Sequence, residues 1–499
     1  MAISLAQLTE MAAQADEPSL VSKCAISPGG VDPLGLRQIN FDLMDQVFPG
    51  LNNVARHIRP FVVTTWAWRR AKQLAENEHY DRIQIEKLRD FVDRIEVIYT
   101  WSQFLRDTNA DLPGRQVLTK LVESESWTFG GEAWLKRRKD RRYSTAFSAP
   151  ITYGPGLKTF GWLATHRENS DVLIPLPESA PALDAFEQEI ADELHHPAFS
   201  HLGEVSVNAT DVLRWAEKWA LDRPTEAEKS VMADMLMGMK APMLRQNGCS
   251  LTLAAAGHVG TSEPSDIRVA MSGTPSNFRP DDKLVPAALA WRRVQVRQLF
   301  RLSLEALLTW IIRRLNDDGP QSSTELVAAF LASSSRNRHL LAADWLTRPE
   351  VDALSPPALL TRIQDRLKTD GLEGLPDAIS DGLAFSIAQA PESSEPFERH
   401  DRLPLARARR EAMAWREVEL EEFLRHLFES WALAQHLYWA VGRGLADARS
   451  RGKRIFRLRV VLDENGWSLT PGTSVNTRPA PSEDRLRTAV TLAKECGLL

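Results

Sequence analysis

The chain has 499 residues, of which 43% are hydrophobic and 25% charged, and this composition excludes a wholly disordered protein. Its formal net charge of -5 excludes global attraction to nucleic acid, so nucleic-acid binding would need a local basic surface. The three cysteines lie far apart and form neither a CxxC metal pair nor a disulfide framework, which fits a reducing cytosol.

The N-terminal segment has no basic leader followed by an apolar core, so we expect no secretory signal. No stretch reaches the roughly 18 uninterrupted apolar residues that a membrane-spanning helix needs. We therefore expect a cytoplasmic protein that does not interact with membranes.

The first informative block is residues 31–72. Residues 40–47 predict a helix that is capped by Asn40 or Asp42 and stopped by Pro49-Gly50. The turn formed by Phe48-Pro49-Gly50 separates this helix from a basic and aromatic segment.

The segment after the turn, residues 51–74, carries apolar residues at four-residue steps, which indicates a helix with one apolar stripe. Pro60 predicts a kink or an interruption in it. Basic residues accompany Trp66 and Trp68, and as candidate phosphate contacts we select Arg56, Arg59, Arg69 and Arg70.

Residues 81–104 predict another helix, and the pattern loosens over residues 112–161. This looser region contains six positive charges within residues 136–142, followed by Tyr143 and Phe147. Positive charge beside aromatic rings is the combination that phosphate contact and base stacking require. The candidate nucleic-acid-binding residues here are Lys136, Arg137, Arg138, Lys139, Arg141 and Arg142.

Such basic runs have a second interpretation, which we favour: most are solvated helix faces, and some arginines bridge carboxylates in the core. The tryptophans have the same two interpretations. Large anchors between helices are the favoured one, and base-stacking platforms are the alternative.

Catalytic motifs are not recognisable in this sequence. His195, His196 and His201 surround a proline and lack the spacing of the HExxH zinc motif. The phosphate-binding loop, the dinucleotide-binding GxGxxG and the GxSxG nucleophile elbow are also missing. We therefore favour a non-enzymatic role with no metal and no cofactor. A nuclease or toxin-like effector with a dispersed site is the alternative, and its first suspects are Asp192, Glu193, His195 and His196.

Two stretches in the second half resemble each other, one beginning at Trp291 and the other at Trp415. They indicate either a degenerate duplication or two long amphipathic helices with the same packing role, and we favour the helices. In either case we expect both tryptophans to be more than half buried at helix–helix contacts.

Near the C-terminus, residues 455–462 and 467–470 predict two strands joined by a turn at residues 463–466. Residues 483–496 predict a final helix. The chain is thus expected to be a mainly α-helical, multi-lobed protein with a small β-hairpin element near the C-terminus. The predicted divisions are residues 1–170, 171–282, 283–390 and 391–499.

The first 75 residues or so carry Leu34-Gly35-Leu36, then Phe48-Pro49-Gly50, then an Arg-rich aromatic segment at residues 56–68. This block resembles the opening of uncharacterised bacterial proteins that are often encoded near anti-phage defence genes. The resemblance implies a defence context and no particular reaction.

These observations lead to three hypotheses. The first is a non-enzymatic subunit of a bacterial anti-phage defence system that binds nucleic acid, partner proteins or both through its Arg/Trp-rich surfaces. The second is the divergent nuclease or toxin-like effector. The third is a pure protein–protein scaffold, which the net negative charge favours slightly over the first. Partner proteins of a multi-subunit complex are the main expected ligands, and nucleic acid is the second.

Overall fold

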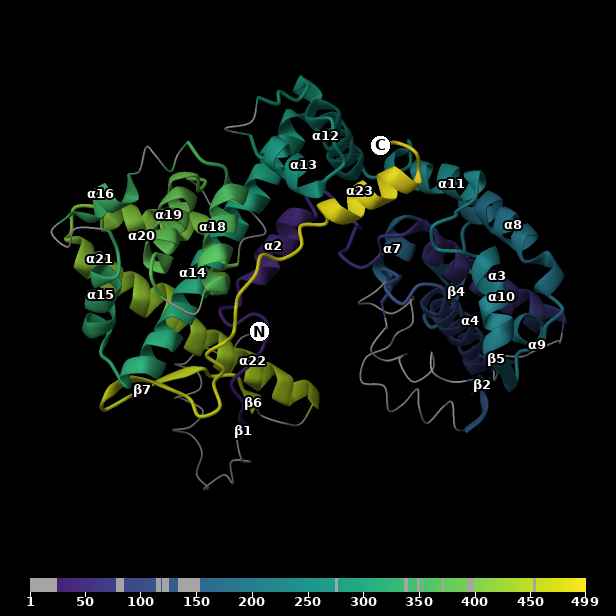
Figure 1. Cartoon of the computed structure of the whole chain (residues 1–499), viewed down its shortest axis with the longest axis horizontal. Coiled ribbons are helices and arrows are strands. Elements are labelled where there is room, and N and C mark those ends of the chain that lie inside the picture. The colour runs from purple at the N-terminus through teal and green to yellow at the C-terminus, as the bar shows by residue number, and fades with distance from the viewer. Residues whose placement is uncertain are drawn as a thin grey trace. The chain divides into compact units, whose positions relative to one another are not determined.

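A computed structural model of the chain describes residues 25–77, 85–113, 118, 125–132, 153–273, 277–335, 340–347, 351, 353–369, 372–392, 399–451 and 455–499 (Figure 1). The fold is mainly α-helical and carries a β-hairpin near the C-terminus, as the sequence predicts.

The chain forms two compact units, each assembled from segments that are distant in the sequence. Unit 1 comprises Met1–Ile39, Val296–Asp352 and Leu359–Pro481, and unit 2 comprises Asn40–Gln295, Ala353–Ala358 and Ser482–Leu499. The division into four consecutive ranges stays a prediction.

Unit 2 consists of helices with two short sheets among its described residues. The helices are α3 (Ile58–Asn77), α4 (Ile85–Arg106), α7 (Gly154–Thr159), α8 (Ala180–Glu189), α9 (Pro197–Ser200), α10 (Ala209–Lys218), α11 (Glu226–Met237), α12 (Met243–Val259), α13 (Pro264–Met271) and α23 (Leu486–Glu495), with single 3-10 turns η2 (Pro177–Ser179), η3 (Ala191–Glu193) and η4 (Asp282–Leu284). Strand β2 (Ser126–Phe129) pairs antiparallel with β5 (Val205–Asn208), and β3 (Leu163–Thr165) pairs antiparallel with β4 (Leu173–Pro175).

The core of unit 2 is rich in aromatic rings. The indoles of Trp66, Trp215 and Trp219 all meet the ring of Phe199 in α9, at centroid distances of 6.1, 4.6 and 5.7 Å. All three tryptophans are buried. Large flat side chains from α3 and from the end of α10 therefore pack together around the short helix α9. This is the favoured interpretation of the tryptophans, as large anchors between helices.

Helix α2 (Arg37–Met44) begins three residues before the predicted start. The carboxylate of Asp32 accepts hydrogen bonds from the backbone N–H groups of Leu36 and Arg37, at 3.0 and 3.4 Å. Asn40 lies inside the helix and is fully buried, so the predicted cap at Asn40 or Asp42 is wrong. The sequence pattern missed the start because the capping side chain precedes a Pro-Leu-Gly stretch.

Helix α3 begins at Ile58, so Pro60 falls in its first turn. A proline is tolerated there because the first-turn N–H groups have no acceptor within the helix. Residues 51–57 are not helical. The predicted helix over residues 51–57 is therefore wrong, and so is the predicted interruption at Pro60, because α3 runs without a break from Ile58 through Pro60 to Asn77.

Unit 1 is built around α14 (Val285–Asp318), whose first part belongs to unit 2. The other helices of unit 1 are α15 (Ser323–Ala332), α16 (Ala342–Leu346), α18 (Pro356–Lys368), α19 (Leu375–Ala388), α20 (Leu405–Ala414), α21 (Leu420–His426), the π-helix η6 (Leu427–Ala434) and α22 (Gln435–Arg451), with the 3-10 turn η5 (His400–Arg402). Strand β1 (Ala25–Ile26) pairs parallel with β6 (Ile455–Phe456), and β7 (Val460–Asp463) pairs antiparallel with β8 (Gly466–Leu469).

Within unit 1, α14 is buried on every side from Val296 to Arg313. Its buried Arg301 donates to both carboxylate oxygens of Glu305 at 2.8 Å and to the carbonyl of Ala480. A helix hidden all round must pair its polar groups internally, because an unpaired buried charge is costly. The Arg and Glu that interrupt the apolar pattern are thus part of the core.

The predicted hairpin is confirmed, but its first strand is shorter than the predicted residues 455–462, because only Val460–Asp463 pairs with β8 while Ile455–Phe456 pairs with β1. Asp463 pairs with Gly466, so Glu464 and Asn465 form the two-residue loop. Gly466 has a φ of +107°, and a Cβ there would lie 2.6 Å from the carbonyl oxygen of Gln321. Glycine is therefore required by the backbone conformation and by the close approach of residue 321.

The two resembling stretches differ in structure at their starts. The first lies within α14, whereas the second starts at the end of α20 and passes through a turn before α21 begins. From Leu420 the second stretch is helical through α21 and η6, which continue into α22, so the interpretation as two long helices is wrong only for residues 415–419. The burial prediction is confirmed: Trp291 has no exposed surface, and Trp415 is more than half buried and stacks on His426 of α21 at 4.6 Å.

Candidate functional site

The four candidate arginines of the opening block lie at the start of α3 and along it. Arg56 precedes the helix and pairs with two carboxylates of unit 2. Its Nη1 lies 2.9 Å from Asp111 Oδ1 and its Nη2 lies 2.9 Å from Glu483 Oε2. Arg56 therefore ties the entry of α3 to the loop after α4 and to the segment before α23.

His57, the next residue, lies between two carboxylates. Its Nδ1 is 2.5 Å from Glu495 Oε1, and its Nε2 is 3.5 Å from Asp111 Oδ2. Burial lowers the pKa of His57, but the hydrogen bonds with Asp111 and Glu495 outweigh it and raise the pKa to about 9. At neutral pH the ring is therefore an imidazolium that holds α23 against the start of α3.

Arg59 has no exposed side-chain surface. Its guanidinium donates to Glu189 Oε2 at 2.5 Å and to the carbonyl of Arg223, and lies 3.2 Å from Glu228 Oε2. Glu228 is fully buried as well, and burial raises its pKa to about 7 although the charge of Arg59 opposes this. Arg59 is the cation of an internal ion-pair network.

Arg69 and Arg70 follow three turns later on α3. Arg69 pairs with Asp184 and Glu187 of α8 and donates to the carbonyl of Leu183. Arg70 donates from Nε to the carbonyl of Phe199 at 3.1 Å. All four arginines thus connect α3 to other parts of unit 2. At Arg56, Arg59 and Arg69 both Nη atoms already have protein partners, so a phosphate contact there, which stays a prediction, would exchange a protein partner for phosphate.

The second group of candidate residues lies outside the described residues. It consists of Lys136, Arg137, Arg138, Lys139, Arg141 and Arg142. Nucleic-acid binding by these six side chains stays a prediction.

The suspects for a dispersed nuclease site lie around η3 and α9. Glu193 accepts hydrogen bonds from Arg214 at 3.0 Å and from the indole of Trp215 at 3.0 Å, and Lys218 lies 3.1 Å from it. Burial raises the pKa of Glu193, but these three donors lower it to about 2. Asp192 pairs with Lys218. Both carboxylates are therefore neutralised by cations of α10.

The two histidines beside them have different roles. His196 accepts the backbone N–H of Ala198 on Nδ1 at 3.1 Å and thereby caps α9, while Nε2 lies 3.6 Å from Asp211. Burial lowers the pKa of His196. His195 is exposed, and its carbonyl accepts a hydrogen bond from Ser200. A nuclease built on these residues stays a prediction, and within the described residues no group of three or more His, Cys, Asp or Glu is arranged to hold a metal ion.

Sequence reasoning missed the partners of the Phe48-Pro49-Gly50 turn. Arg485 donates to the carbonyl of Phe48 at 3.0 Å, and the buried Arg245 donates to the carbonyl of Pro49 at 3.1 Å. Thr488 of α23 donates to the carbonyl of Asn52 at 2.7 Å. These bonds satisfy backbone groups that the irregular stretch cannot satisfy itself. The final helix was predicted over residues 483–496, but the sequence could not show that Arg485 and Thr488 bind the carbonyls of Phe48 and Asn52.

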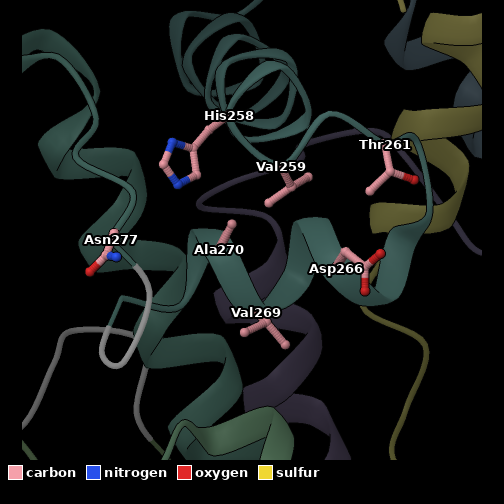
Figure 2. A pocket seen from close by; sticks show the side chains of 7 residues that line it. All are labelled: His258, Val259, Thr261, Asp266, Val269, Ala270 and Asn277. Carbon is pink, nitrogen blue, oxygen red and sulfur yellow. The ribbon is translucent and has the colours of Figure 1, made fainter.

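An open pocket of about 430 Å³ lies between the end of α12 and α13 (Figure 2). Val259, Val269 and Ala270 give it apolar walls, and polar side chains complete the lining. No motif in the sequence marks this pocket. The polar lining residues are His258, Thr261, Asp266 and Asn277.

No helix of the described ranges combines the length and the apolar character that crossing a lipid bilayer demands. Comparisons of this chain with protein-family models, with curated proteins and with solved structures find no match. A functional assignment therefore rests on the residues of this chain.

Proposed function

We propose that this protein is a non-enzymatic, cytoplasmic subunit of a bacterial anti-phage defence assembly. Its main ligands are partner proteins, and nucleic acid is a second ligand. The defence context rests on the resemblance carried by residues 34–36, 48–50 and 56–68.

The observation that carries the partner-protein role is the use of charge inside unit 2. Arg59 neutralises the buried Glu228, and Glu193 is held by three donors of α10. Arg59 is one of the candidate phosphate contacts, and Glu193 belongs to the alternative nuclease site. Their internal pairing supports a protein whose charged residues hold a defined shape, which is what a subunit offers to its partners.

The assembly is tested by purifying the tagged protein from its own host, with and without nuclease treatment, followed by mass spectrometry. We expect a protein partner in stoichiometric amount that remains after the nuclease, because protein contacts do not depend on bound nucleic acid. A protein that arrives alone under gentle lysis, in both treatments, would contradict the subunit role.

The specific observation that favours nucleic acid as second ligand is the density of charge at residues 136–142. Each phosphate that a protein neutralises adds about -0.9 to the slope of log affinity against log salt. We expect replacement of the six basic residues by serine to weaken DNA binding and to flatten this slope by up to about 5. Fluorescence anisotropy over a salt series measures both effects.

The matched control replaces exposed cations elsewhere, Lys368 and Arg416, by serine. These changes lower the net positive charge without touching residues 136–142, and the slope should stay as in the wild type. A wild-type slope near zero, or an unchanged slope in the six-residue variant, would remove nucleic acid from the proposal.

A further inference from the structure

An apolar knob projects where α11 connects to α12. It consists of Met239, Pro242, Met243 and Leu244; Met239 is 100% exposed, Met243 69% and Leu244 46%. Adjacent exposed apolar side chains of this size mark interaction surfaces, and methionine adapts its shape to a partner's cavity.

Two side chains of α12 fix the backbone on which the knob is built. Arg245 donates to the carbonyls of Met235 and Leu236 at the end of α11, at 2.7 and 3.3 Å. Gln246 donates to the carbonyls of Gly238 and Ala241, at 3.1 and 2.7 Å. Both ends of the connection are therefore fixed by buried or half-buried side chains of α12, so little conformational freedom is lost when the knob binds.

The pocket with apolar walls lies at the opposite end of the same helix (Figure 2). The 17 residues of α12 separate the knob from the pocket by about 25 Å, at 1.5 Å per residue. Val269, which is 37% exposed, and Ala270 offer apolar contact, and the ring of His258 lies 5.4 Å from that of Phe278. Aromatic edges of this kind are favourable neighbours for a methionine sulfur.

Charge is complementary at the two ends. Lys240 follows Met239, is 83% exposed and makes a single surface pair with Glu178, which it can exchange at little cost. Asp266 is exposed on the rim of the pocket. A knob entering the pocket with Lys240 beside Asp266 would therefore match apolar with apolar surface and cation with anion.

We propose that copies of this chain associate head to tail, with the knob of one copy seated in the pocket between α12 and α13 of the next. A second copy is the occupant because the two complementary surfaces lie at opposite ends of one rigid helix. Such a contact is heterologous, so each copy retains a free knob or a free pocket and the assembly grows with concentration. The contact is small, which places its dissociation constant on the order of 10–100 μM.

Sedimentation velocity of the full chain tests this inference over about 1–200 μM. The wild type should show a sedimentation coefficient that rises with concentration, and Met239→Glu and Val269→Glu should each remain monomeric. The control Leu213→Glu, an exposed apolar residue on α10, should associate as the wild type does. A wild type that stays monomeric throughout, or a Met239→Glu variant that associates normally, overturns the proposal.

Mixing the variants gives the decisive result. Met239→Glu retains a pocket and Val269→Glu retains a knob, so their equimolar mixture should form a 1:1 dimer that does not grow further. An interface that uses one patch on both copies would leave the mixture monomeric, and that outcome overturns the head-to-tail arrangement.

The charge pair provides a second test that does not depend on Val269. Lys240→Glu and Asp266→Lys should each weaken association at least tenfold at low salt, and the double variant should restore it. If the double variant associates no more strongly than the single variants, Lys240 does not lie beside Asp266 in the contact.

Discussion

Replacing Arg59 by methionine is expected to destabilise unit 2 by about 3–5 kcal/mol at pH 8, because it leaves a buried carboxylate without its cation. Glu228 has no exposed surface, and Arg59 Nη2 lies 3.2 Å from its Oε2. The carbonyl of Arg223 and Glu189 lose a donor at the same time. Urea unfolding followed by tryptophan fluorescence measures the loss, and hydrogen exchange locates it in α3 and α11.

The loss should depend on pH in a defined direction. Burial raises the pKa of Glu228 from 4.5 to about 7, so its ionisation opposes folding increasingly as pH rises through that window. Without Arg59 this opposition grows, and the variant should be closer to the wild type at pH 5 than at pH 8. The double variant Arg59→Met, Glu228→Gln removes both charges and should recover most of the lost stability.

Arg69→Met is the matched control on the same helix. Arg69 is partly exposed and pairs with Asp184 and Glu187 near the surface, so its replacement should cost less than about 1 kcal/mol. If Arg59→Met cost no more than Arg69→Met, the buried pair would not exist as described. Arg59 would then be available to bind phosphate, and this result would support the nucleic-acid hypothesis.

The difference between these two arginines explains what the sequence could and could not predict. Both lie in a basic, aromatic stretch, and nothing within α3 distinguishes the fully buried Arg59 from the partly exposed Arg69. The partners of Arg59, Glu189 and Glu228, lie 130 or more residues away. A local pattern therefore locates the cation, but only the tertiary fold decides whether it meets water, phosphate or a carboxylate.

Local signals predicted the hairpin correctly but misplaced the starts of α2 and α3. The hairpin follows from alternating strands around a turn at residues 463–466. Pro60 does not interrupt a helix, because it lies in the first turn of α3, where its missing N–H breaks no helical hydrogen bond. Helix α14 shows the limit of such signals. Arg301 and Glu305 interrupt its apolar run, yet they pair with each other inside unit 1 because the helix is covered on every side.

His436 carries the second large prediction, because one buried ring joins three segments of unit 1. A carbonyl only accepts and a backbone N–H only donates, so Nδ1 donates to Pro33 O at 2.9 Å and Nε2 accepts from Arg459 N at 2.9 Å. The ring is therefore neutral. Burial lowers its pKa from 6.5 to about 4, because the charged ring would lose its hydration, and the charge of Arg459 acts in the same direction while the Pro33 carbonyl opposes the shift.

The wild type should therefore lose about 3 kcal/mol of unit 1 stability as pH falls from 6.5 to 4 on account of this residue. The unfolded chain takes up the proton first in this window, so stability falls with falling pH and levels off below pH 4. His436→Leu should cost about 3 kcal/mol at pH 7.5, because it leaves the Pro33 carbonyl and the Arg459 N–H unpaired. Between pH 6.5 and 4, the slope of its unfolding free energy against pH should also be smaller than that of the wild type, by the amount that corresponds to the uptake of about one proton.

Urea unfolding at a series of pH values measures both effects, and hydrogen exchange in peptides from β1, α22 and β7 assigns them to unit 1. The exposed His195 of unit 2 supplies the control, since His195→Leu changes the same residue type without breaking a buried bond of its ring. Parallel pH curves for the wild type and His436→Leu would show that the ring takes up its proton equally in the folded and unfolded chain. In that case other hydrogen bonds would hold the same segments together. Gln435 donates to the carbonyl of Leu34, next to Pro33, and the guanidinium of Arg459 donates to the carbonyl of Gly30.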